Sequence, residues 1–213
     1  MADEALPALT LDTLREAVAG AGVALRLTQR LQPAGGAGDK VFPPTYETDD
    51  RQGRLRYAVE TRRIDGKDVG VVLLDSVASQ ANRIEAALFD AWSAGQLDFP
   101  VIGVDFNNED DLADLGYISA LHAPHRIADA LLRDALTPDG QPFRDSLDGR
   151  DYTSASTRNA TAVYRLCPTA LVLGVWDSTG PRGGKGAKFQ RALVSEVVGV
   201  GYAAGTKTAS RMD

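Results

Sequence analysis

Residues 56–75 limit the possible folds more than any other stretch, because they read as a β-hairpin. Tyr57 and Val59 alternate with charged residues, as in a strand that has one face in water. Asp65-Gly66 offers a tight turn, and the apolar run Val69-Gly-Val-Val-Leu-Leu follows it. A continuous apolar run of this kind is typical of a strand inside a sheet. The chain is therefore expected to build a sheet around this hairpin.

An amphipathic helix is predicted directly after the hairpin. Asp75-Ser76 provides an N-cap. Apolar residues then recur at helical spacing, at Val77, Ala81, Ile84, Leu88 and Trp92. The opposite face carries Ser79, Asn82 and Arg83, with Gln80 at its boundary. Hydroxyl, amide and guanidinium groups bind phosphates and sugar hydroxyls, so this face is a candidate RNA surface, and the alternative is an ordinary capped surface helix.

Helices and strands are expected to alternate along the rest of the chain. The expected elements are a helix near 11–18 ending at Gly20, a half-buried strand at 23–31, a short strand at 101–104, a helix from Pro124 with Ile127, Leu131 and Ala135 inward, a helical stretch within 154–166, a strand at 170–176 and a last helix with Phe189, Leu193 and Val197 inward. This order favours an α+β fold, an antiparallel sheet with helices on one face, of the split βαβ (ferredoxin-like) type. A doubly wound parallel sheet is the alternative.

A glycine-rich loop with two cations follows the expected strand at 170–176. Glycine lets backbone N–H groups approach a ligand closely, and a following helix would add partial positive charge, so Lys185 and Lys188 favour a bound anion. The loop is not a P-loop, because Thr179 stands where the first glycine is required and Gly186 stands where a hydroxyl is required. A phosphate or nucleic-acid site is therefore favoured over nucleotide hydrolysis, and a solvated loop is the alternative.

Charge is distributed unevenly along the 213 residues, whose net charge is −6. Residues 1–149 contain 14 Lys/Arg against 25 Asp/Glu, whereas residues 150–213 contain 9 against 4. A polyanion is therefore expected at the C-terminal part and not at the acidic stretch 105–114. The length suits one domain, no apolar run is long enough to span a membrane, and the N-terminus lacks a signal-peptide pattern. These features predict a cytoplasmic protein.

No catalytic, metal or cofactor site is predicted. His122 and His125 lack a third histidine for a metal, and Cys167 has apolar neighbours and Pro168 beside it, which indicate a core thiol. A single cysteine also excludes an internal disulfide and a cysteine-rich zinc site. The chain is accordingly expected not to be an enzyme.

Five segments together resemble a known family. They are Phe42-Pro-Pro-Thr-Tyr, Leu73-Leu-Asp-Ser-Val-Ala-Ser-Gln-Ala-Asn-Arg-Ile-Glu, Ala123-Pro-His-Arg-Ile-Ala-Asp-Ala-Leu-Leu-Arg-Asp, Leu173-Gly-Val-Trp-Asp-Ser-Thr-Gly and Gly186-Ala-Lys-Phe-Gln-Arg-Ala-Leu-Val-Ser-Glu. In this order they are similar to the RAMP-superfamily backbone subunit of type I-G (formerly I-U) CRISPR effector complexes. The resemblance runs from about residue 24 to the end of the chain.

The resemblance implies a non-enzymatic subunit that stacks in copies along the guide RNA (crRNA) and presents it to target DNA, together with other CRISPR effector subunits. It implies an RRM-like palm with inserted finger and thumb segments, as one RAMP-type domain over 1–213 with insertions around 32–55 and 105–122. Because members of that family usually continue past a segment like Ala209-Ser-Arg-Met-Asp, the resemblance leads us to expect a truncated or a naturally short form.

Carried over by segment, the resemblance gives a set of expected RNA-binding residues: Ser79, Gln80, Asn82, Arg83, Arg126, Arg182, Lys185, Lys188 and Arg191. Two other functions stay open. One is a nucleotide-binding enzyme that uses the glycine loop. The other is an endoribonuclease that cuts the guide precursor, with His122 and His125 as its only candidate catalytic residues.

Overall fold

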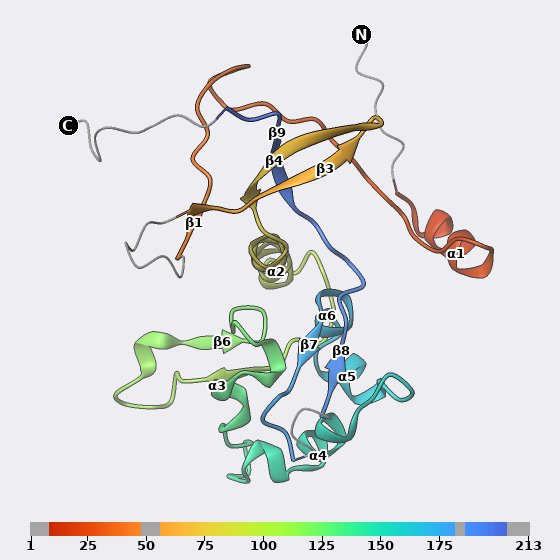
Figure 1. Ribbon diagram of the computed structural model, residues 1–213. Coiled ribbons are helices and arrows are strands. Elements are labelled where there is room, and N and C mark those ends of the chain that lie inside the picture. Colours follow the sequence, from red (N-terminus) through yellow and green to blue (C-terminus); the bar gives the residue numbers. More distant parts are fainter. Residues whose placement is uncertain (1–8, 48–55, 182–185, 204–213) are drawn as a thin grey trace. The chain divides into compact units, whose positions relative to one another are not determined.

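The computed structural model describes residues 9–47, 56–181 and 186–203 (Figure 1). The chain divides into two compact units, Met1–Val41 and Phe42–Asp213. In the first unit, α1 (Leu11–Ala19) starts after Thr10, whose hydroxyl accepts the Thr13 N–H, and it ends at Gly20. The predicted first helix is thus confirmed. The strand predicted at 23–31 is wrong, since those residues form no ladder with another segment that the structure describes.

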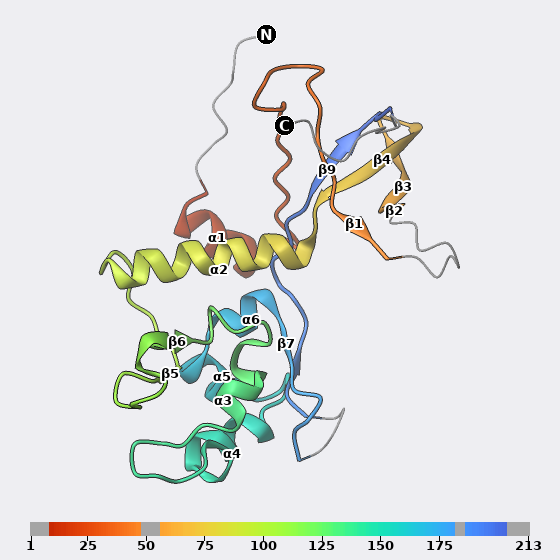
Figure 2. The same ribbon diagram turned by 90° about the vertical axis from the view of Figure 1, so that its left-hand side faces the viewer.

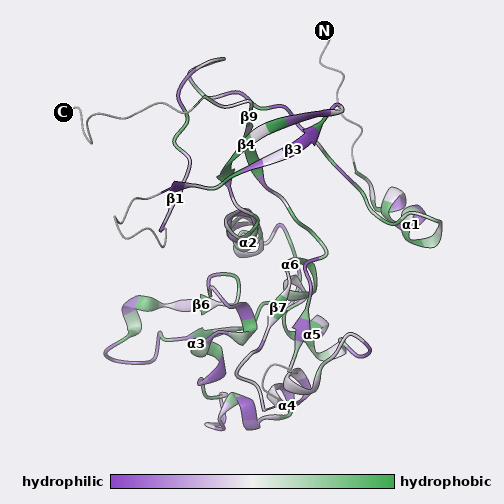
Figure 3. Cartoon of the chain, viewed as in Figure 1, coloured by the Kyte–Doolittle hydropathy of each residue, from purple (hydrophilic) through white to green (hydrophobic). Residues whose placement is uncertain are grey.

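The predicted hairpin is the centre of the main sheet. β3 (Val59–Ile64) and β4 (Lys67–Asp75) pair antiparallel around Asp65-Gly66, and both turn residues have positive φ, 50° and 78°. Such a left-handed pair matches the twist of the two strands. β9 (Val197–Val200) pairs antiparallel with the other edge of β4, so the strand order is β3-β4-β9. The valines in the middle of β4 are buried, and Figure 3 shows the hydrophilic residues of β3 beside them.

The predicted amphipathic helix is also confirmed. α2 (Val77–Ser93) starts after Ser76, whose hydroxyl accepts the Ser79 N–H at 3.2 Å. Figure 2 shows the helix along its length. Ala81 is buried as expected, whereas Asn82 and Arg83 on the other face are exposed.

In the sequence between α2 and β9, a series of short elements surrounds a second hydrophobic core. They are β5 (Gly103–Asp105), η1 (Ala113–Leu115), β6 (Tyr117–Ser119), η2 (Arg126–Ala128), α3 (Ala130–Arg133), η3 (Phe143–Asp145), α4 (Leu147–Ser154), α5 (Thr161–Leu166), α6 (Thr169–Leu173), β7 (Val175–Trp176) and β8 (Lys188–Phe189). Their buried side chains form one cluster that includes Ile127, Tyr152, Val163 and Cys167. Cys167 is thus the core thiol that its neighbours in the sequence indicate.

Three predicted elements differ from the structure. The helix expected from Pro124 is broken into η2 and α3, because Arg126 adopts a positive φ of 55° and Asp129 an extended conformation. The strand expected at 170–176 is mostly α6, which ends at Gly174 before the short β7. The last helix is wrong, since residues 186–200 contain β8, an extended segment and β9.

The fold class is mixed, with helices and small antiparallel sheets, which is compatible with the expected α+β class. Every described ladder is antiparallel, including the small pair of β1 (Thr45–Tyr46) and β2 (Arg56–Tyr57), so the doubly wound parallel alternative does not apply to the described residues. The insertions expected around 32–55 and 105–122 stay predictions, and part of the first lies outside the described residues. None of the described helices is long and apolar enough to cross a membrane.

Candidate nucleic-acid interface

The polar face of α2 is organised by one carboxylate. Asp75 Oδ2 accepts hydrogen bonds from Gln80 Nε2 at 2.6 Å and from Arg83 Nε at 2.8 Å. The pKa of Asp75 lies below its ordinary value because the Ser79 hydroxyl, the Gln80 amide and the Arg83 guanidinium all donate to the ionised form. Arg83 remains largely exposed, so its guanidinium keeps donors for a further acceptor. Asn82 lies beside it on the same exposed face.

The segment before β9 meets this face. Ser195 Oγ donates to Gln80 Oε1 at 2.8 Å, which joins residues 115 positions apart. Arg191, in the same extended segment, lies close to α2, where its charge acts on the Glu85 carboxyl. The structure therefore joins the polar α2 face to the C-terminal segment through Ser195, and it brings Arg191 near Glu85 on the buried side of α2, from an extended segment and not from a helix.

Arg126 has an internal partner. Its guanidinium donates from Nε and Nη2 to the two carboxylate oxygens of Glu85, at 2.6 and 2.9 Å, and from Nη1 to the Gly174 carbonyl at 3.1 Å. Both side chains are buried, with 9% of Arg126 and 3% of Glu85 exposed. Burial raises the pKa of the Glu85 carboxyl above its ordinary value, against the opposing charges of Arg126 and Arg191. In the structure, Arg126 connects α2 to η2 and α6 and presents no free guanidinium edge to a ligand.

Glu85 was not singled out from the sequence, although a signal existed. It is four residues after Ala81 and three before Leu88, so it belongs to the apolar stripe of α2. A charged residue inside such a stripe requires a buried partner of opposite charge. The partner is not recognisable from local spacing, because Arg126 is 41 positions away.

The glycine loop connects two strands. Val175 pairs with Phe189 and Trp176 with Lys188, and Asp177 N–H donates to the Ala187 carbonyl at 2.8 Å. The loop thus joins the two strands of a ribbon, β7 and β8. The helix expected after the loop is absent from residues 186–203. The argument from a helix N-terminus therefore does not hold for Lys188. Arg182 and Lys185 lie outside the described residues.

Asp177 fixes the first turn of that loop. Its buried carboxylate accepts the Thr179 N–H and hydroxyl, both at 3.2 Å, and forms an ion pair with Arg144 at 2.9 Å. Gly180 allows this approach, because a Cβ there would stand 3.1 Å from Asp177 Oδ2. The base of the loop is consequently held by the core.

The two histidines contact the rest of the fold in different ways, His122 through its ring and His125 through its backbone. The His122 Nδ1 lies 3.2 Å from the Ser119 hydroxyl, and its ring packs against Phe89 with centroids 4.1 Å apart. The His125 N–H donates to Asp129 at 3.2 Å. Among the described residues, no group of three or more His, Cys, Asp or Glu side chains is arranged to hold a metal ion.

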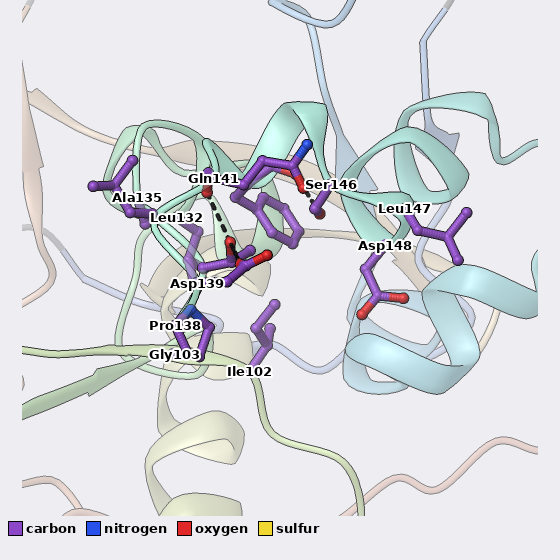
Figure 4. A pocket seen from close by; sticks show the side chains of 13 residues that line it. Ile102, Gly103, Leu132, Ala135, Pro138, Asp139, Gln141, Ser146, Leu147 and Asp148 are labelled. Atoms are coloured by element: carbon purple, nitrogen blue, oxygen red, sulfur yellow. Dashed lines mark hydrogen bonds between the residues drawn. The ribbon is translucent and has the colours of Figure 1, made fainter.

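A pocket of about 470 Å³ lies apart from this interface, between β5 and the α3–α4 region. Figure 4 shows apolar side chains such as Ile102 and Leu132 among those that line it, together with the carboxylates of Asp139 and Asp148. The described lining residues include carboxylates and no lysine or arginine, so the pocket does not suit a polyanion.

One family model matches the chain, that of the CRISPR-associated protein GSU0053 family, and it covers residues 25–203. No curated protein and no solved structure matches the chain. The matched range contains the α2 face, the β7–β8 ribbon and the Ser195 segment. It extends over most of the 213 residues. The chain therefore belongs to the CRISPR-associated protein GSU0053 family.

Proposed function

We propose that this protein is the RNA-binding backbone subunit of a type I-G (formerly I-U) CRISPR effector complex. In this role, copies of the chain line up along a crRNA in the cytoplasm, contact other effector subunits and present the guide to target DNA. Family membership supports a role in a CRISPR system. The observation that carries the RNA-binding role is the Ser195–Gln80 hydrogen bond, which joins the polar α2 face to the positively charged C-terminal part.

The proposed interface consists of side chains that donate hydrogen bonds or carry positive charge. Its described members are Ser79, Gln80, Asn82, Arg83, Lys188 and Arg191, and Arg182 and Lys185 complete the set. Such groups hold the sugar-phosphate backbone with little dependence on sequence, which suits a subunit that must accept any guide. The β3-β4-β9 sheet with α2 would be the RRM-like palm of this subunit.

Arg126 fits a different role. Its guanidinium uses its donors on Glu85 and Gly174 inside the protein, so in this proposal it holds the C-terminal segment in place and does not contact RNA. Arg126 then affects the interface only indirectly. It binds the Gly174 carbonyl, and the side chain of Arg191 lies against the Gly174 backbone.

The salt dependence of crRNA binding tests the proposal. We expect the affinity to fall steeply with salt, because phosphate contacts release counterions. The variant Arg83→Ala/Lys188→Ala/Arg191→Ala should bind more weakly and show a shallower slope of log K against log salt, by about 0.7 or less for each cation removed. Fluorescence anisotropy with labelled crRNA at several salt concentrations measures both quantities.

The matched control removes the same charge elsewhere. Arg150→Ala/Arg158→Ala/Arg165→Ala takes three exposed cations from α4, α5 and the turn between them. We expect this variant to keep nearly the wild-type slope. Equal slopes for all three proteins, or equal losses in the two variants, would remove the proposed interface. Guide precursor that is incubated with the wild-type chain should stay intact, as a non-catalytic subunit requires.

A further inference from the structure

An exposed tryptophan stands on the β7–β8 ribbon. Trp176 is 54% exposed, while its neighbours Val175 and Asp177 are buried. The alternation of the strand directs Val175 and Asp177 into the core and leaves the indole outside. Val175 pairs with Phe189 and Trp176 itself with Lys188, and the Asp177 N–H donates to the Ala187 carbonyl, so the backbone is paired at and on both sides of the indole. The indole is therefore presented at the surface by a paired strand.

A cation accompanies the ring. The Lys188 Nζ lies 4.8 Å from the centroid of the Trp176 indole, within the range of a cation–π contact. An aromatic platform beside a cation is a combination by which proteins bind single-stranded nucleic acids, with a base stacked on the ring and a phosphate on the cation. An apolar protein partner would gain nothing from that charge.

We propose that a nucleobase of the bound RNA stacks on the Trp176 indole, while the Lys188 ammonium pairs with an adjoining phosphate. This inference rests on the proposed function and adds a base-contacting site to an interface that otherwise contacts the backbone. Stacking accepts every base, because each has a π face, so the site is compatible with guides of any sequence.

Tryptophan fluorescence tests the contact directly. The chain contains two tryptophans, and Trp92→Phe leaves Trp176 as the only one. Trp92 lies on α2, where its ring stacks near Tyr117 with centroids 6.4 Å apart, so the substitution leaves the ribbon intact. The Trp92→Phe protein is titrated with single-stranded RNA and with an abasic RNA of the same length, and binding of each is followed in parallel by anisotropy. We expect strong quenching by RNA and little quenching by the abasic strand at equal saturation.

Affinity provides the second measurement. Trp176→Ala should weaken RNA binding by about 5- to 150-fold and leave binding of the abasic strand nearly unchanged, because one stacked base contributes about 1–3 kcal/mol. Trp176→Phe should keep much of the affinity. Lys188→Ala should weaken both strands to a similar extent, since a phosphate contact does not need the base. Thermal melting checks that each variant is folded.

The outcomes separate this inference from the function on which it rests. Equal quenching by both strands, or equal losses of affinity for both in Trp176→Ala, overturns the stacking contact while RNA binding stands. Absence of binding to either strand by the wild type overturns the proposed function itself. If Trp176→Ala binds RNA normally but no longer assembles with copies or other effector subunits, the indole contacts protein and the inference is wrong.

Discussion

The buried pair of Glu85 and Arg126 shows that the sequence can indicate the burial of a residue without indicating its partner. The position of Glu85 within the apolar stripe of α2 indicates burial, but its partner depends on the tertiary fold. Arg126 is an expected RNA contact only because its segment resembles the family, and that resemblance says nothing about the direction of the side chain. The positive φ of Arg126 turns the chain at this point and helps to break the predicted helix into η2 and α3.

Breaking this pair is expected to destabilise the protein strongly. Arg126→Leu leaves the Glu85 carboxylate buried without a partner and should lower the free energy of unfolding by about 3–5 kcal/mol. The double variant Glu85→Leu/Arg126→Leu removes both charges and should recover much of that loss, because no unpaired charge remains. Urea denaturation of the wild type, both single variants and the double variant measures the coupling. A double variant that is no more stable than Arg126→Leu would contradict this account.

Gly174 is a second position at which a single side chain matters. Its φ is 83°, and an added Cβ would lie 2.9 Å from Arg191 Cγ and 3.1 Å from the backbone atoms Arg191 N and Phe189 O. Gly174→Ala should therefore lower the free energy of unfolding by about 2 kcal/mol or more, from backbone strain and crowding together. Gly140→Ala is the control, since Gly140 has a φ of 81° and open space around it. Thermal melts that show equal losses would exclude the crowding.

At the scale of elements, the sequence predicts what local pattern determines. The hairpin has alternation and an Asp-Gly turn, and α2 has a cap and an apolar period, so both are confirmed. The last helix is wrong because Phe189, Leu193 and Val197 happen to be four residues apart, while Val197-Val-Gly-Val favours a strand through its β-branched residues. Its pairing with β4 joins residues more than 120 positions apart, which no local pattern contains.

The junction of β4 and α2 leads to a pH-dependent prediction. The pKa of Asp75 is lower in the folded protein than its unfolded value of 3.8. The ionised carboxylate therefore stabilises the fold at pH values above 3.8, and this stabilisation is lost as the pH falls through the folded pKa. Asp75→Asn should thus be less stable than the wild type at pH 7, by about 1–2 kcal/mol from weakened hydrogen bonds. The difference should shrink as the pH falls below 3.8.

Urea denaturation of both proteins between pH 7 and pH 3 checks the Asp75 prediction. Asp90→Asn is the matched control, because Asp90 is an exposed carboxylate on the same helix. It should differ little from the wild type at any pH in this range. A constant difference between Asp75→Asn and the wild type across the range would show that charge at Asp75 does not matter.

At the scale of the whole molecule, composition and order predict the mixed class but not the arrangement. The C-terminal segment leaves the second core at β8, passes α2 at Ser195 and ends in the main sheet as β9. Ser195 meets Gln80 only because of this path. Charge statistics place the basic residues in the C-terminal part, yet the approach of Arg191 to α2 follows from the fold alone.

The single thiol offers a practical consequence of the second core. Cys167 is enclosed by α4, α5 and α6, and burial raises the pKa of its thiol. A maleimide or disulfide reagent can therefore modify it only when these helices separate, and every labelled molecule reports the same event, since the chain has one cysteine. The labelling rate, with and without RNA, would record how often this part of the protein opens and whether added RNA holds it closed.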